Sequence, residues 1–324
     1  MNNLTAGNWS VADDSFSEMF LKQNLNQFWV PEEVSLSRDL LSWETLSEDE
    51  KDSYMKVLAG LTLLDTIQGD NGMPAVADTV TSHQQKAVLS FMGAMENAVH
   101  ARSYSTIFQT LATAKEIEEA FNWVENDPVM QKKAKIINDF YLRVKAKKAG
   151  KYLNMMVKVA SVFLESFLFY SGFFYPLWFA GKGKLRGAGE IISLIVRDES
   201  VHGVFVGLLF QTEYNALSES EQQEVKDMVL KLIHDLIECE KEYTRYLYDK
   251  VDLTHEVMQY VKYNANKSLQ NLGFEDEFEH EEVNMIVMNG INTVSQDHDF
   301  FSQKGNSYRK PTVVGVQDND FIFD

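Results

Sequence analysis

The sequence predicts an all-α protein, and three observations carry this prediction. Glycine and proline, the residues that break helices, number only 17 and 5 among 324 residues, well below their average share of about 12%. Apolar side chains recur at steps of three and four along nearly the whole chain, as on one face of a helix. No segment alternates apolar and polar residues as strands do. We therefore expect one domain of eight or more helices over residues 1–273.

Capping residues and helix breakers predict where individual helices begin and end. Ser47 and Glu50 form a capping box that opens a helix running to about Gly69. Pro128, a common first-turn residue, opens another. The other predicted helices span about 74–80, 83–111, 115–125, 152–179, 188–215, 218–250 and 255–271. From Phe274 charged residues and then Gly, Asn, Ser and Gln dominate, so residues 274–324 are predicted to be a partly disordered tail.

The composition excludes several classes of protein. Acidic residues outnumber basic ones by 48 to 30, a net charge of −18, so the chain is expected to repel nucleic acids. Its one cysteine, Cys239, cannot form a disulfide within the chain. The first residues resemble no secretory leader, which predicts a cytoplasmic location. Residues 159–180 are apolar enough to cross a bilayer, but Glu165 near their middle would be costly in lipid, so we expect a buried helix and no membrane.

Four predicted helices each carry an acidic residue on an apolar face. Acidic side chains are rarely buried unless they are paired or bind a metal. The residues concerned are Asp65, Glu96 with His100, Glu165, and Glu199 with His202. Ferritin-like di-iron and di-manganese bundles use this arrangement of carboxylates and Glu/His pairs, and two divalent cations would balance four carboxylates. The sequence therefore predicts a ferritin-like di-metal carboxylate bundle elaborated with extra helices.

Taken singly, these residues have simpler explanations. Asp65 alone could cap a neighbouring backbone group, and Glu165 alone could pair with a buried arginine. Tyr104, one turn after His100, would by itself be an ordinary core tyrosine. The pair Glu277 and His280 has ligand spacing too, but it lies in a charge-dense, solvated segment and is rejected. The joint pattern on four helices is what favours a metal centre.

The chain resembles the small, radical-generating subunit of class I ribonucleotide reductase, and most of all its class Ib form. The resemblance covers almost the whole chain. Its motifs are QFWVPEEVSLSRD at 27–39, LLDTIQG at 63–69, HARSY at 100–104, LESFLFYSGFF at 164–174 and RDESVHG at 197–203. It implies a beta subunit of ribonucleoside-diphosphate reductase, which takes part in making the deoxyribonucleotide precursors of DNA. The alternative is a ligand-binding di-metal oxidase of the same fold.

The resemblance also implies a cofactor, a pair of manganese or iron ions beside a stable tyrosyl radical. The implied ligands are Asp65, Glu96 and His100 for one ion and Glu165, Glu199 and His202 for the other, with bridging carboxylates between them. The family commonly shows Glu-x-x-His on the second helix, whereas three residues separate Glu96 from His100 here. Both side chains still share one face, and a single π-turn would absorb the extra residue.

Further residues are implied to handle the radical. Tyr104 would hold it, inside an apolar pocket made by Phe169, Phe173 and Ile195. A hydrogen-bonded chain of Trp29 and Asp198 would lead from His100 toward a partner, and Tyr308 in the tail would relay the radical across the interface. A plain oxidase needs no such long-range path.

The resemblance implies three protein partners. One is a second copy of the chain, in a homodimer, and another is a flavodoxin-like activator. The third is the catalytic alpha subunit, on which the C-terminal end would dock through Phe321, Ile322 and Phe323. A single cysteine fits this division of labour, because ribonucleotide reduction needs a pair of cycling thiols that only the partner can supply.

Overall fold

The computed structural model describes residues 5–290, so Tyr308 and the predicted docking end lie outside the described residues. The described part is helical almost throughout and holds no strand, which confirms the all-α prediction. Its α-helices are α1 (Ser17–Asn26), α2 (Asp39–Trp43), α3 (Glu48–Ile67), α4 (Met73–Asp78), α5 (His83–Met95), α6 (Ala101–Leu111), α7 (Ala114–Asn126), α8 (Pro128–Lys145), α9 (Leu153–Phe163), α10 (Tyr170–Gly181), α11 (Arg186–Tyr214), α12 (Glu219–Tyr248) and α13 (Thr254–Asn271).

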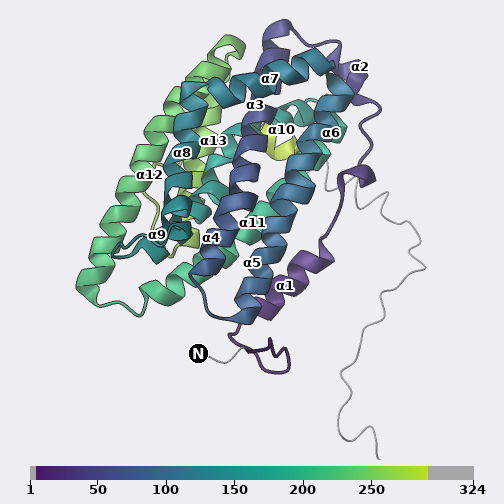
Figure 1. Cartoon of the computed structure of the whole chain (residues 1–324). Helices are drawn as coiled ribbons and strands as arrows, with labels where there is room; N and C mark the ends of the chain where they lie inside the picture. The colour runs from purple at the N-terminus through teal and green to yellow at the C-terminus, as the bar shows by residue number, and fades with distance from the viewer. Residues whose placement is uncertain (1–4, 291–324) are drawn as a thin grey trace, which may run out of the picture.

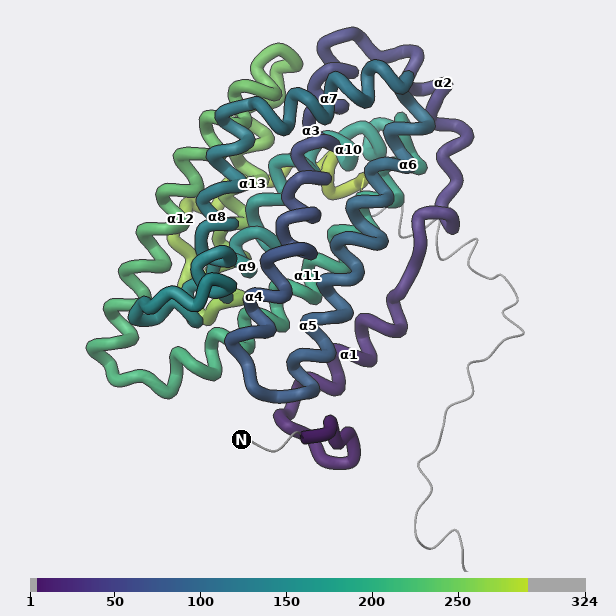
Figure 2. The backbone as a smooth tube through the Cα atoms, viewed as in Figure 1, coloured from purple at the N-terminus to yellow at the C-terminus, as the bar shows by residue number. Residues whose placement is uncertain are grey.

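Short helical segments of other types join several of these helices. Three are π-helices, η2 (Gln68–Gly72), η3 (Glu96–His100) and η4 (Leu164–Leu168), and two are 3₁₀ turns, η1 (Pro31–Glu33) and η5 (Asp249–Val251). Each π-helix continues directly from one α-helix into the next, so α3–η2–α4, α5–η3–α6 and α9–η4 with α10 run as nearly unbroken rods (Figure 2).

The predicted caps account for several helix starts. The Ser47 hydroxyl accepts from the Glu50 amide while the Glu50 carboxylate accepts from the Ser47 amide, which completes the capping box. Pro128 lies in the first turn of α8, and the Asp127 side chain accepts from the Met130 amide. Each cap satisfies amides that the first helical turn leaves without partners.

One predicted boundary was wrong. The helix expected to end near Gly69 continues through η2 into α4, because the wider π-turn accommodates the Gly-Asp-Asn-Gly sequence without breaking the rod. Helices α1 and α2 were not predicted. They are short, and α2 has only five residues, so neither shows a long apolar stripe.

The rods assemble into a bundle around a central set of four. This set consists of α3, α5–α6, α9–α10 and α11, which pack on one another along their lengths. Helices α8 and α12 run together along one side, whereas α1 covers the opposite side next to α5 (Figure 1). Helix α7 crosses one end of the bundle.

The longest apolar stretch is the heart of this bundle. The helical segment Leu153–Gly181 is long and apolar enough to span a bilayer, but its most apolar window is completely buried inside the protein. The predicted buried helix is thus confirmed. Beyond Asn271 the chain folds back on the bundle, where Phe274 and Phe278 pack against the core and Val287 is fully buried. The placement of the domain boundary at 273 stays a prediction.

Candidate metal centre

The structure brings the six predicted ligand side chains together in the middle of the bundle. They come from the four central rods: Asp65 from α3, Glu96 and His100 from η3, Glu165 from η4, and Glu199 and His202 from α11. All six are fully buried. Four acidic side chains with no exposure are far outside the usual behaviour of aspartate and glutamate, so their proximity has to be explained by what neutralises them.

π-Helices lie at three of the four contributing rods. Glu96 and His100 are the first and last residues of η3, so the π-turn takes up the extra residue of the Glu-x-x-x-His spacing, as predicted. The intervening Asn97 faces outward, and its amide donates to Asp70 Oδ1 at 2.9 Å in the neighbouring η2. Glu165 is the second residue of η4. Two of the rods thus have π-turns where they carry predicted ligands, and a third has one that begins three residues after Asp65.

The ligand atoms form two overlapping groups. In each group, the oxygen and nitrogen atoms all lie within 4.8 Å of one another. One group is Asp65, Glu96, His100 and Glu199, and the other is Glu96, Glu165, Glu199 and His202. Because Glu96 and Glu199 belong to both, the cluster has the layout of two adjacent cation sites with two shared carboxylates.

Short distances link the two imidazoles to the shared acids. His100 Nδ1 lies 2.9 Å from Glu199 Oε1 and 3.2 Å from Glu96 Oε2. His202 Nδ1 lies 2.7 Å from Glu96 Oε1 and 3.4 Å from Glu199 Oε2. The two rings are nearly parallel with centroids 6.0 Å apart, so each histidine serves a different end of the cluster.

Many of these atoms lie close together without forming hydrogen bonds. Among the described residues, both oxygens of Asp65, both of Glu199 and both ring nitrogens of His202 have no hydrogen-bond partner. Buried polar atoms are normally hydrogen-bonded, and a cluster of exceptions indicates a place where an ion or a water molecule binds. Lone pairs that converge on common points are what a metal ion requires. The donor set of carboxylate oxygens and two imidazoles suits iron and manganese alike.

The pKa values of the clustered side chains are shifted by burial and by the charges of their neighbours. Burial raises the pKa of Asp65 and Glu165 well above the usual carboxyl range, and the negative charges of Glu96 and Glu199 raise both further. Burial would lower the pKa of His100, but the charges of Glu96 and Glu199 raise it well above its ordinary value. Protons therefore neutralise the cluster when no cation does, since acids this deep cannot all ionise alone.

Tyr104 lies one helical turn beyond His100 on α6 and is fully buried. Burial raises the pKa of its phenol well above 10, and the charges of Asp65 and Glu199 raise it further. The hydroxyl has no hydrogen-bond partner among the described residues. A phenolate is thus strongly disfavoured, so an electron can leave this side chain only together with the phenolic proton.

The three residues predicted to shield Tyr104 are also completely buried. Phe169 follows η4 directly, Phe173 lies one turn further on α10, and Ile195 lies one turn before Glu199 on α11. The rings of Phe169 and Phe173 stack with centroids 5.6 Å apart. Their burial keeps water away from this part of the core, which a shielding role requires.

A hydrogen-bonded chain leaves the cluster through His100. Its Nε2 lies 3.2 Å from Asp198 Oδ2, and the same oxygen accepts from Trp29 Nε1 at 2.7 Å. Trp29 is almost fully buried, and its ring stacks at 6.4 Å from the His100 ring. A carboxylate on one ring nitrogen fixes the tautomer and orientation of a histidine, and here it joins His100 to an aromatic ring.

Asp198 accepts hydrogen bonds from more side chains than the sequence predicted. Gln27 Nε2 donates to Asp198 Oδ1 at 2.9 Å, and the Arg197 guanidinium lies 3.2 Å from the same oxygen. Burial alone would raise the pKa of Asp198, but the His100 hydrogen bond and the His100 and Arg197 charges lower it overall. Both missed residues lie inside the quoted motifs: Gln27 two positions before Trp29, and Arg197 next to Asp198.

A second missed contact holds Glu165. The Gln68 side chain donates to Glu165 Oε1 and to the Ser161 hydroxyl, and it accepts from Tyr141 Oη at 2.7 Å. All four side chains are fully buried. Gln68 is the first residue of η2, three positions after Asp65. Its place on the Asp65 face was the only sequence signal for this role.

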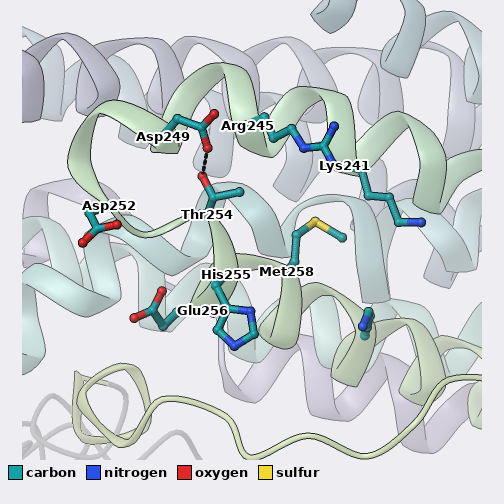
Figure 3. A pocket seen from close by; sticks show the side chains of 9 residues that line it. Lys241, Arg245, Asp249, Asp252, Thr254, His255, Glu256 and Met258 are labelled. Atoms are coloured by element: carbon teal, nitrogen blue, oxygen red, sulfur yellow. Dashed lines mark hydrogen bonds between the residues drawn. The ribbon is translucent and has the colours of Figure 1, made fainter.

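A surface pocket lies away from this cluster. It is an open depression of about 450 Å³ between the end of α12 and the start of α13, lined by Lys241, Arg245, Asp249 and His255 among others (Figure 3). Opposite charges alternate around it, and Thr254 donates to Asp249 across it. None of its lining residues belongs to the carboxylate cluster, so the candidate site is the buried centre.

Comparison with known proteins decides the family. Residues 6–285 match the family model described as ribonucleotide reductase, small chain. The chain belongs to this family. A ribonucleoside-diphosphate reductase subunit beta of Bacillus subtilis (strain 168) is 54% identical over 319 residues, which cover 98% of this chain and 96% of that protein. The ribonucleoside-diphosphate reductase 2 subunit beta of Escherichia coli (strain K12) is 40% identical over 328 residues, covering 100% and 99% respectively.

A solved structure shows the same architecture. The crystal structure of Streptococcus sanguinis dimanganese(II)-NrdF matches with a TM-score of 0.85 at 46% identity, covering 89% of this chain and 100% of that one. The predicted family, the ferritin-like helical fold and the enzyme, a ribonucleoside-diphosphate reductase small subunit, are therefore confirmed. The alternative of a ligand-binding oxidase is not favoured.

Proposed function

We propose that this chain assembles a di-metal centre, stores an oxidising equivalent on Tyr104 and delivers it to a catalytic alpha subunit that reduces ribonucleotides. One observation carries the proposal. Two overlapping ligand groups share Glu96 and Glu199, and the histidine of one group continues into the Asp198–Trp29 chain. A metal centre joined to a path along which an electron can enter from the partner as the oxidising equivalent leaves is what a radical-generating subunit needs, whereas a storage or oxidase site would not need the path.

Each ligand group would hold one ion. Asp65, Glu96 and His100 would bind the first, and Glu165, Glu199 and His202 would bind the second, with the shared carboxylates between them. Manganese is supported by the dimanganese state of the similar Streptococcus sanguinis protein, and the oxygen-rich donor set accepts iron as well. When bound, the metal pair supplies the oxidising power that the protein side chains lack.

Tyr104 would give up an electron and a proton together. Its pKa excludes prior ionisation, and the nearby negative charges of Asp65 and Glu199 mark the side toward which the proton can move. Phe169, Phe173 and Ile195 would exclude water from the resulting neutral radical, which is thereby protected from reductants. This role accounts for a buried tyrosine whose hydroxyl otherwise has no partner.

The path from the centre would run through His100, Asp198 and Trp29. The Asp198 carboxylate accepts from both rings, so it can hold the imidazole and the indole in fixed register while an electron passes. Gln27 and Arg197 would keep this carboxylate ionised and oriented. Tyr308 would continue the path at the interface.

Partners follow from the same proposal. The extreme C-terminal segment would dock on the catalytic subunit, a flavodoxin-like protein would activate the manganese form, and the location would be the cytoplasm. A homodimer is supported by the exposed apolar side chains of Met19, Leu25 and Phe28 near the N-terminus, which lie more than 40% exposed and would gain from burial. Light scattering at micromolar concentration is expected to give twice the chain mass of 37.1 kDa.

The proposal is tested by metal loading and electron paramagnetic resonance on matched tyrosine variants. The wild-type chain is expected to bind two manganese or iron ions and to show a tyrosyl radical after activation. Tyr104→Phe should keep both ions and lose the radical and ribonucleotide reduction with the catalytic subunit. Tyr175→Phe is the control, because Tyr175 is also fully buried with an unpartnered hydroxyl but is not near the cluster. A radical that persists in Tyr104→Phe would refute the proposal.

A further inference from the structure

A second buried charge cluster lies outside the metal centre, between α8 and α12. Lys133 Nζ lies 2.6 Å from Glu240 Oε1, and these side chains are 1% and 0% exposed. The ammonium also lies 4.2 Å from the centre of the Tyr243 ring. Neither Lys133 nor Glu240 belongs to the ligand groups.

The stability of the fold does not explain such a pair. Removing two charges from water is costly, and replacement of a buried ion pair by well-packed apolar side chains is often neutral or stabilising. An explanation must therefore come from what else the charges contact.

The lysine has two further partners, both on the rod that carries Glu165. Lys133 Nζ donates to the Leu168 carbonyl at 2.8 Å and to Ser171 Oγ at 2.9 Å. Leu168 is the last residue of η4, and Ser171 lies in the first turn of α10. The charge thus reaches the point where the π-helix returns to an α-helix.

The backbone at this point explains why a donor is needed. The Phe169 amide donates five residues back to the Leu164 carbonyl at 3.3 Å, which closes the π-turn. The amides of Gly172 and Phe173 then both donate to the Phe169 carbonyl, at 2.9 and 3.0 Å. The Gly172 amide, which would serve Leu168 in a regular α-helix, is thus directed to Phe169 instead. A buried carbonyl deprived of its helical donor is costly, and Lys133 supplies the missing hydrogen bond.

The neighbouring contacts hold the same junction from other sides. Tyr248 on α12 donates to the Ser171 carbonyl at 2.5 Å. A Cβ added at Gly172 would come within 2.6 Å of the Leu61 side chain, so α10 packs tightly against α3 here. The junction is therefore fixed by α3, α8 and α12 together, and Lys133 is its only charged contact among those described.

We infer that Lys133 is a positioning residue for the metal centre. Its ammonium, held by Glu240, binds the Leu168 carbonyl and keeps η4 in the π-helical register that directs Glu165 into the carboxylate cluster. Loss of this anchor lets the segment relax toward regular α-helix, which rotates Glu165 relative to Phe169. The inference rests on the proposed function, because it concerns a ligand of the proposed centre.

The test replaces the pair with apolar residues and follows manganese binding. The double variant Lys133→Met/Glu240→Leu removes both charges together, so no uncompensated charge remains. Titration of the full-length metal-free chain with Mn²⁺, followed by the resonance of free Mn²⁺, is expected to show at least tenfold weaker binding of one of the two ions. In the metal-free state, amide hydrogen exchange over residues 164–173 should quicken at least tenfold at temperatures far below unfolding.

The control is a second buried lysine that does not touch the π-helix. Lys158 is fully buried and lies 2.8 Å from Glu213, but its other partners are Thr79 and the Asn154 carbonyl. Lys158→Met/Glu213→Leu should leave both Mn²⁺ affinities and the exchange of 164–173 unchanged, whatever it does to the melting temperature. Lys133→Arg, which keeps the charge and the donors, should retain tight binding of both ions.

The outcomes separate this inference from the proposed function. Unchanged Mn²⁺ binding and unchanged exchange in the Lys133 double variant would overturn the positioning role. If wild-type protein bound no Mn²⁺, the proposed function itself would fail. Should the double variant not fold, Lys133→Met/Glu240→Gln also leaves the Leu168 carbonyl without its donor and carries the same expectations.

Discussion

The metal centre and the Lys133–Glu240 pair bury acidic side chains equally deeply, yet they neutralise them in different ways. In the centre, Asp65, Glu165 and their neighbours face other acids and two imidazoles, and protons take up the negative charge, as the raised carboxyl pKa values show. Glu240 instead faces a lysine ammonium 2.6 Å away. The acids of the centre are neutralised by protons, which a metal ion could replace, whereas Glu240 is neutralised by the ammonium of Lys133, which is part of the chain.

This difference shows how to recognise a ligand site in a buried core. A buried acid with a basic partner is complete, and it serves to hold backbone in place. A group of buried acids without lysine or arginine is incomplete until a cation enters from outside. In both clusters the π-helix η4 is the common element, since it carries Glu165 at one end and offers the Leu168 carbonyl at the other.

The largest expected effect is on the free energy of unfolding, which should differ between a variant of one cluster and a variant of the other. In the metal-free protein, Glu240→Gln leaves the Lys133 ammonium buried without a counter-charge and should lower the free energy of unfolding by about 3–5 kcal/mol. Glu199→Gln should change it by about 1 kcal/mol or less, because the cluster loses one of four mutually repelling acids and can bind one proton fewer in exchange. Both substitutions preserve side-chain volume. Urea unfolding of the two variants measures the contrast, and equal losses would contradict it.

Metal addition should affect the two variants in the opposite order: the gain in the free energy of unfolding should be small for Glu199→Gln and clear for Glu240→Gln. Mn²⁺ at a free concentration of about 100 times its dissociation constant should raise the free energy of unfolding of the wild-type chain by about 2.7 kcal/mol per site. Glu199→Gln should gain much less, because Glu199 belongs to both ligand groups. Glu240→Gln, if still folded, should keep a clear gain. Melting curves with and without Mn²⁺ give the answer, and a full gain in Glu199→Gln would show that the shared carboxylate is not a ligand.

The two clusters also differ in how well the sequence alone could predict them. Apolar spacing and caps predicted nearly every long helix, and the coincidence of acids on four apolar faces predicted Asp65, Glu165 and their companions. Residues that contact backbone or bind ligands indirectly could not be found this way. Lys133 is one of many lysines, and its role exists only because η4 deprives Leu168 of its donor. The π-turn at Glu96 could be anticipated only because the histidine spacing had one residue too many.

A smaller effect on stability is expected from a change in the chain of His100, Asp198 and Trp29. Trp29→Phe removes the indole donor to Asp198, but Gln27, Arg197 and His100 still contact that carboxylate. The free energy of unfolding should therefore fall by only about 0.5–1.5 kcal/mol, and both metal ions and the Tyr104 radical should remain. Turnover with the catalytic subunit should be lost. Full turnover in this variant would show that electrons reach the centre from the catalytic subunit by another route.

The smallest expected effect concerns the single thiol, which lies next to Glu240 on α12. Burial, and then the charge of Glu240, raises the pKa of Cys239 to about 11, and the side chain is fully buried. A thiol reagent should therefore reach it only in opened molecules, where the thiol has its ordinary pKa of about 8.5.

Labelling of Cys239 should speed up about tenfold per pH unit below pH 8 and change less than about threefold between pH 9 and 10. A rate that keeps rising toward pH 11 would instead mean reaction in the folded state. At pH 8, labelling of Glu240→Gln should be about 150- to 5,000-fold faster than wild type, matching its loss of about 3–5 kcal/mol, whereas Glu199→Gln should label at nearly the wild-type rate. Equally fast labelling of both variants would mean that the two buried clusters are not independent parts of the core.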